Sequence, residues 1–236
     1  MKEDRSLRAV ARWAGALNVL SGFPDGFSVT TFRKLIILGD PAATAAHVVG
    51  SETMFRWAVV ADLVGILFFA ASGVLLYEVF KPANRRAALI YLVVISMGAV
   101  CQALALMHTL GGLALLKAGL PTAQANALAI VDFKMYSQGY QLGLFFDAIS
   151  SLIMGVLILQ STFVPRFLGP LMWLDGIGGL TFTLVGFLSP SLVKIIYPFI
   201  PFATVLVGEG TFYLWLMIKS VNAERWHEQA AARPPL

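Results

Sequence analysis

Seven polar side chains lie within apolar stretches of this chain, where they can do chemistry that surface residues cannot. They are Asp25, Asp62, Gln102, His108, Asp147, Asp175 and Glu209. No Lys or Arg lies at the depth of the five acids to pair with them. A buried carboxyl group without a cationic partner either keeps its proton or is neutralised by a bound cation. The chemistry that these residues indicate is therefore binding of protons or cations.

Helical spacing places these residues on faces that are rich in small and polar side chains. Asp25 shares a face with Ser21 and Ser28, and Asp62 shares one with Gly65. Small and hydroxyl side chains together are typical of the interior of a membrane helix bundle. We expect four residues in the outer half of the membrane and three near its middle, lining one pocket that opens outward. The outer group is Asp25, Asp62, Gln102 and His108, and the middle group is Asp147, Asp175 and Glu209.

Motifs for metals, cofactors or catalysis are missing. Zinc prefers Cys and His ligands, but Cys101 is the single cysteine and His108 is the one histidine within an apolar stretch. An oxygen-rich site for Mg²⁺ or Ca²⁺ lacks a spaced motif. G-x-S-x-G, H-E-x-x-H, Walker and G-x-G-x-x-G patterns are absent as well. The sequence thus assigns no metal site, cofactor or catalytic residue.

The elements that carry these residues must lie in a bilayer. Of the 236 residues, 58% are hydrophobic and only 13% are charged, with a mean hydropathy of +0.78. Too few polar side chains remain to cover a soluble monomer of this size, so composition excludes that class. Spanning a hydrocarbon layer of about 30 Å takes about 20 helical residues. Six stretches qualify: 10–31, 54–78, 87–116, 137–160, 167–188 and 196–218.

These stretches predict an all-α membrane protein built as a bundle of six transmembrane helices. The first stretch is the weakest because it holds Asn18, Pro24 and Asp25, so five spans are the alternative. We expect its helix to bend at Pro24 and to direct Asp25 toward another helix. The pairs Gly22–Gly26 and Gly139–Gly143 fit close helix contacts.

Basic residues predict the orientation, because they gather at the cytoplasmic ends of spans. With six spans, eleven Lys and Arg fall on the side of the termini and six on the other, so both termini are expected in the cytoplasm. No basic stripe with interleaved aromatics points to nucleic acid. Short interfacial helices are expected at 41–49, capped by Asp40, and at 121–134. Residues 1–221 are expected to form a single domain, followed by a polar, frayed cytoplasmic tail at 222–236.

Several short sequence segments, some in loops and some within the expected spans, resemble a bacterial membrane family, domain of unknown function 4386. They are Gly39-Asp40-Pro41-Ala42-Ala43-Thr44, Ala61-Asp62-Leu63, Pro82-Ala83-Asn84-Arg85, Phe163-Val164-Pro165-Arg166 and Gly208-Glu209. The resemblance covers most of the chain and implies a multi-pass protein of the bacterial cytoplasmic (inner) membrane with no established activity. Asp62 and Glu209 fit the family's pattern, whereas Asp147 and Asp175 fall outside it.

These observations favour three function classes. The first is a binding or transport protein whose outward acidic pocket holds protons, a cation or a lipophilic cationic ligand, with Asp62 and Glu209 acting together. The second is a membrane-embedded enzyme that uses a carboxyl group as general acid or base on a lipid-like substrate. The third is a structural or assembly subunit, in which each acid only bonds neighbouring helices. The lipid bilayer is the expected partner, and an oligomer or a membrane complex is left open.

Overall fold

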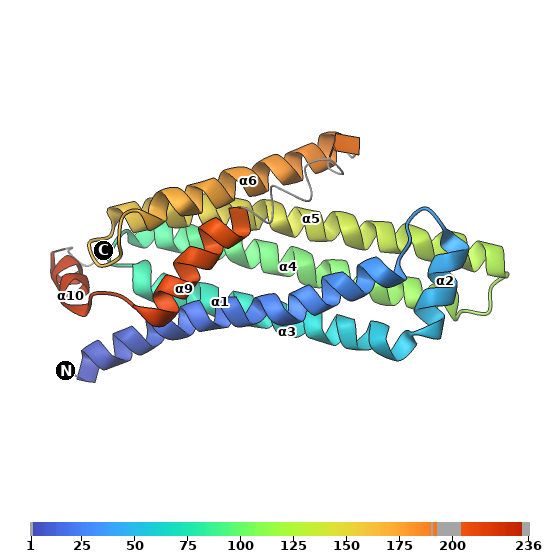
Figure 1. The fold of residues 1–236 in the computed structure, drawn as a ribbon, viewed down its shortest axis with the longest axis horizontal. Helices are drawn as coiled ribbons and strands as arrows, with labels where there is room; N and C mark the ends of the chain where they lie inside the picture. Colours follow the sequence, from blue (N-terminus) through green and yellow to red (C-terminus); the bar gives the residue numbers. More distant parts are fainter. Residues whose placement is uncertain (1, 190, 193–203, 233–236) are drawn as a thin grey trace. The chain divides into compact units, whose positions relative to one another are not determined.

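The computed structural model describes residues 2–189, 191–192 and 204–232, and this part of the chain folds into helices without a strand (Figure 1). Four helices are long and apolar enough to cross a bilayer: α3 (Glu52–Phe80), α4 (Arg85–Leu116), α5 (Thr122–Gln160) and α6 (Leu168–Leu188). The expectation of an all-helical protein with helices of membrane-spanning length and composition is therefore confirmed.

The first and last expected spans are not among these four helices. Helix α1 (Lys2–Leu35) contains the stretch 10–31 and continues through Pro24, but it is not among the four apolar helices. Residues 196–203 of the last stretch lie outside the described residues. The rest of that stretch contains a π-helix, η1 (Val205–Gly210), that runs into α9 (Thr211–Ile218). The count of six spans and the bend at Pro24 stay predictions.

The chain divides into two compact units. The terminal unit comprises Met1–Val19, Phe68–Gly98 and Leu144–Leu236, and the middle unit comprises Leu20–Leu67 and Ala99–Gly143. Helices α1, α3, α4 and α5 each contribute residues to both units. Each unit has an apolar core of its own.

The core of the middle unit is aromatic. The ring of Phe32 lies 5.3 Å from that of Phe55 and 5.2 Å from that of Tyr136, measured between centroids. Helix α2 (Pro41–Gly50) begins as its sequence predicts, because Asp40 Oδ1 accepts a hydrogen bond of 2.9 Å from the backbone N–H of Ala43. The expected short helix at 41–49 is thus confirmed as a helix.

The second short helix, expected at 121–134, is wrong as a separate element. Its residues form the first part of α5, which runs without interruption for 39 residues. No proline interrupts this segment, and Asp132, which suggested a polar surface helix, lies within hydrogen-bonding distance of His108 on α4. At 1.5 Å per residue, α5 is about 58 Å long, nearly twice the thickness of the hydrocarbon layer.

In the terminal unit, α9 packs closely against the first turns of α1. A Cβ atom added to Gly15 would lie 2.5 Å from the carbonyl oxygen of Tyr213. Beyond α9 the chain turns at Ser220, whose φ of 62° is left-handed, and the Ser220 hydroxyl donates to the carbonyl of Arg8 at 3.0 Å. These contacts hold the end of α9 against α1.

The segment after Asn222 does not fray as expected. It forms α10 (Ala223–Ala231), with Asn222 as its N-cap. The indole N–H of Trp226 donates to the carbonyl of Val79 at 2.8 Å, and Gln229 accepts from the backbone N–H of Thr162 at 2.9 Å. Two tertiary hydrogen bonds therefore fix a segment whose composition alone indicated disorder, and residues 233–236 lie outside the described part.

The glycine pairs also differ from expectation. Space is open within 4 Å of a Cβ added to Gly22 or Gly26, as far as the described residues go, so this pair makes no close helix contact there. Gly139 does, because its Cβ would lie 2.9 Å from Cβ of Ala105. Gly15, which belongs to neither pair, and Gly139 are two of the glycines at close helix contacts, and spacing alone did not separate them from Gly22 and Gly26.

We predict that Gly15→Ala destabilises the protein by about 1–3 kcal/mol, because the added methyl group meets the backbone of α9 and the helices must shift apart. The measurement is thermal unfolding of the purified protein in detergent. Gly22→Ala is the matched control in the same helix. It has room for the methyl group and should be neutral, or more stable by up to about 1 kcal/mol. Equal melting temperatures for the two variants would contradict the close contact between α1 and α9.

Candidate functional site

The buried acids of this protein form two groups, one in each unit. Asp25 and Asp62 belong to the middle unit together with Gln102 and His108, whereas Asp147, Asp175 and Glu209 belong to the terminal unit. These are the same two groups that the sequence predicts to lie at different depths.

Two tyrosines of α5 bind the two acids of the middle unit. The hydroxyl of Tyr140 donates to Asp25 Oδ1 at 3.1 Å, and the hydroxyl of Tyr136, one turn earlier, donates to Asp62 Oδ2 at 3.4 Å. The bond from Tyr140 confirms that Asp25 contacts another helix. Gly65 allows α3 to approach α1, since its Cβ would lie 3.2 Å from the carbonyl of Ser21. This approach brings the two carboxyl groups close enough to repel each other.

The bonding of this acid pair is incomplete. Asp62 is 1% exposed and Ser28, which faces it, is 0% exposed. Neither Asp62 Oδ1 nor the Ser28 hydroxyl makes a hydrogen bond of good geometry to another described residue. Neither Asp25 nor Asp62 forms an ion pair within the described residues. An unpaired polar atom in the interior costs about 1–3 kcal/mol, so these two atoms, whose mutual interaction falls short of a hydrogen bond of good geometry, are a candidate place for an occupant.

The two other predicted residues of the middle unit lie beside different partners. Gln102 is buried on α4. His108 Nδ1 lies 3.0 Å from Asp132 Oδ1, and both side chains are partly exposed. His108 is therefore engaged by an acid that the sequence analysis placed on the polar face of a surface helix.

The terminal unit holds the second group of acids. Asp175, on α6, is 6% exposed and is hydrogen-bonded with Ser151 of α5. Glu209, on η1, interacts electrostatically with Asp175 and Asp147. The buried phenols of Tyr91 and Tyr213 lie near Glu209. As in the middle unit, carboxyl groups are gathered next to tyrosine hydroxyls.

Glu209 reaches this position from a π-helix. Gly208 permits the approach, since a Cβ added there would lie 2.5 Å from Cβ of Asp175 and 2.6 Å from the carbonyl of Leu171. The wider turn of η1 displaces one residue from the regular α-helical spacing, and such turns are frequent at functional sites. The closeness of η1 and α6 thus depends on one glycine.

The carboxyl and hydroxyl side chains that lie together in each unit offer oxygen atoms only. Within the described residues, no three His, Cys, Asp or Glu side chains lie together as ligands of a metal ion would. Carboxylate and hydroxyl oxygens suit protons and hard cations, whereas zinc and copper prefer nitrogen and sulfur ligands. The arrangement can therefore bind or pass a proton or a small hard cation.

Sequence reasoning missed three members of these groups. Tyr213 lies in an apolar stretch where an aromatic residue looks like core packing, Tyr136 directly precedes the stretch 137–160, and Asp132 was placed on a surface helix. The spacing of four residues between Tyr136 and Tyr140 is the signal that would have found the first. One shared pocket and a joint action of Asp62 and Glu209 would each combine residues of both units, and both stay predictions.

Comparison with known proteins identifies a family. A family model described as a domain of unknown function (DUF4386) matches residues 10–220. No curated protein and no solved structure matches the chain.

We predict that Tyr140→Phe and Asp25→Asn are energetically coupled. In a double-mutant cycle followed by thermal unfolding, the coupling should be about 1 kcal/mol, because Tyr140→Phe removes the donor and Asp25→Asn replaces the carboxyl acceptor by a weaker amide oxygen. Tyr136→Phe is the matched control on the same helix. It should couple less strongly to Asp25→Asn, since its hydroxyl is bonded to Asp62 instead. Equal coupling for both tyrosines would contradict the described bonding.

Proposed function

This chain belongs to the DUF4386 family, and from the chemistry of its middle unit we propose that it binds protons or a small monovalent cation between Asp25 and Asp62. The observation that carries the proposal is the pair of buried oxygens, Asp62 Oδ1 and the Ser28 hydroxyl, which face each other without a hydrogen bond of good geometry. They lie beside a second carboxyl group at a place where no Lys or Arg of the described residues supplies positive charge.

Charge balance supports this proposal. Two like charges in a medium of low dielectric constant repel strongly, so Asp25 and Asp62 cannot both be ionised at low cost. A shared proton leaves one negative charge, and a bound monovalent cation would offset one as well. Either occupant also gives the free lone pairs of Asp62 Oδ1 a partner.

The size of the surroundings supports a small occupant over a bulky one. Asp62 and Ser28 are enclosed, and the rings of Tyr136 and Tyr140 lie 6.1 Å apart beside them. The two carboxyl groups and three hydroxyl groups provide oxygen ligands of the kind that hard cations prefer. A lipophilic organic cation would need this cluster to open, whereas a proton would not, and a dehydrated monovalent ion demands far less space than an organic cation.

The same proposal includes the placement of the chain in the membrane. We propose a multi-pass protein of the bacterial cytoplasmic membrane with six spans, counting α1 and the segment that ends with α9, and with both termini in the cytoplasm. The excess of Lys and Arg on the side of the termini supports this orientation.

For the cation site, we predict that Na⁺ stabilises the purified protein more than N-methylglucamine of equal concentration does. At ten times its dissociation constant, a single ion adds about 1.4 kcal/mol of stability. The effect should grow from mildly acidic to mildly alkaline pH, because a carboxyl group must lose its proton before it binds a metal cation. Melting temperatures in detergent across both salts and several pH values measure it.

Asp62→Asn and Asp25→Asn should each remove the dependence on Na⁺, because Asn keeps the size of Asp and loses its charge. Asp132→Asn is the matched control in the same unit, since Asp132 lies beside His108 rather than in the acid pair. If Asp62→Asn keeps the ion dependence and the pH profile of the parent, the acids only bond helices to one another. A response of the parent to pH that no cation alters would assign the site to protons.

For topology, we predict that a green fluorescent reporter is bright and alkaline phosphatase is inactive when either is fused at the C-terminus. The reverse should hold for fusions just before α2, since that segment is expected outside. The physical reason is the retention of Lys and Arg on the cytoplasmic side. Active alkaline phosphatase at the C-terminus would overturn the orientation.

A further inference from the structure

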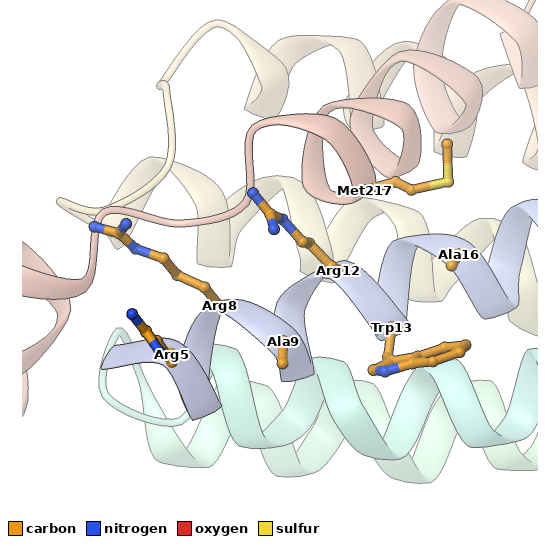
Figure 2. Close-up of a pocket in the computed structure, with 7 residues that line it drawn as sticks. All are labelled: Arg5, Arg8, Ala9, Arg12, Trp13, Ala16 and Met217. Atoms are coloured by element: carbon orange, nitrogen blue, oxygen red, sulfur yellow. The ribbon is translucent and has the colours of Figure 1, made fainter. Parts of the chain in front are cut away.

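The first turns of α1 and the end of α9 border a cavity of about 560 Å³ within the terminal unit, and this cavity is open on one side. Arg5, Arg8 and Arg12 line it from α1, and Met217 lines it from α9 (Figure 2). The arginines succeed one another at intervals of three and four residues, so they lie along one face of the helix. The volume is in the range of ligand sites, about 300–1,000 Å³.

The cavity carries net positive charge. Arg5, Arg8 and Arg12 are exposed, and none of their guanidinium groups forms an ion pair with a carboxylate in the part of the chain that the structure describes. The nearby acid Asp4 is engaged by His227, at 3.1 Å. Unpaired guanidinium groups in a shared hollow attract an anion, and their planar forks match the oxygens of a phosphate.

The walls of the cavity are apolar, which a site for a free anion would not require. The indole of Trp13 lies beside the arginines and is 59% exposed. Met217 forms the opposite wall, and Leu214, one turn earlier on the same face of α9, is exposed as well. Exposed tryptophan and basic residues together are typical of the level of the lipid headgroups. The exposed side chains of α9 offer acyl chains an apolar surface next to the charges.

A second cavity, in the middle unit, also combines an arginine with a tryptophan, but its arginine has an ion-pair partner. Arg56 and Trp57 line this cavity of about 230 Å³. There the guanidinium group is neutralised by Glu52, at 2.9 Å. Composition alone therefore does not make the first cavity distinctive, but three unpaired guanidinium groups in one hollow do.

We propose that the cavity between α1 and α9 binds the headgroup phosphate of an anionic phospholipid. Arg8 and Arg12 hold the phosphate oxygens, Arg5 adds charge at the rim, and the acyl chains lie along Met217 and Leu214. Basic pockets between membrane helices commonly bind such headgroups. This site is independent of the acid pair and lies wholly within the terminal unit.

The test is a lipid titration of the protein in neutral detergent, with bound lipid counted by native mass spectrometry. Phosphatidylglycerol should be retained over phosphatidylcholine with the same acyl chains. Arg8→Gln combined with Arg12→Gln should lower the affinity for phosphatidylglycerol roughly thirtyfold, taking about fivefold for each basic residue. Glycerol phosphate, which lacks acyl chains, should displace the lipid poorly.

The matched control combines Arg85→Gln with Arg86→Gln, which also removes two exposed positive charges but at the start of α4, away from the cavity. This pair should change the affinity less than about threefold, because exposed charges at a distance from the site are screened by salt. Melting temperatures verify that both double variants fold. An equal loss in the control, equal retention of the two lipids, or full displacement by glycerol phosphate would each overturn the proposal.

Discussion

The structure depends on the free-energy cost of burying a polar group without a hydrogen-bond partner in a place that water does not reach. In a hydrocarbon medium, each carboxyl, hydroxyl or backbone group that enters the interior must be satisfied by the chain or by something the chain binds. This rule accounts for the bond between Tyr140 and Asp25, and for the serine and asparagine contacts that close turns at Ser220 and Asn222. It also makes the exceptions informative. Asp62 Oδ1 and the Ser28 hydroxyl are buried and face each other without a hydrogen bond of good geometry, so an occupant there would gain bonds that the described residues leave unmade.

The same rule explains which parts of the fold the sequence predicts well. Long apolar stretches and local caps need only neighbouring residues, and α3, α4, α6 and the Asp40 cap of α2 can be predicted directly from them. The prediction of a separate helix at 121–134 is wrong because a charged residue between apolar residues looks like the end of a span. Asp132 instead finds His108 on another helix, and no local pattern announces a partner 24 residues away. The expectation of a frayed segment after Asn222 is wrong for a related reason, because the indole of Trp226 donates to the carbonyl of Val79, which lies on α3 and far away in the sequence.

For the candidate site, the sequence separates the acids by expected depth and predicts one pocket for all of them, but it does not predict what completes each group. In the structure, Asp25 and Asp62 belong to the middle unit, and Asp147, Asp175 and Glu209 belong to the terminal unit. The tyrosines beside them look like packing residues, because an aromatic side chain within apolar sequence carries no mark of its hydrogen bond. The arginines of α1 indicate only orientation when the sequence is taken alone, since the cavity they line also requires Met217 from the far end of the chain.

The π-helix η1 has a consequence for how this protein can vary. Successive residues of a regular helix are rotated by about 100° about its axis, and a π-turn accommodates one residue more than that spacing allows. Loss of a single residue between Val205 and Gly210 would therefore let the segment relax to a regular α-helix while the residues on either side keep their faces. Phe212 and Tyr213 would stay in the core, and the change would be confined to the wide turn that carries Glu209 beside Asp175. A change of length by one residue is thus easier to accommodate within η1 than in a regular turn of α6 or α9, where it would rotate the following residues by about 100°.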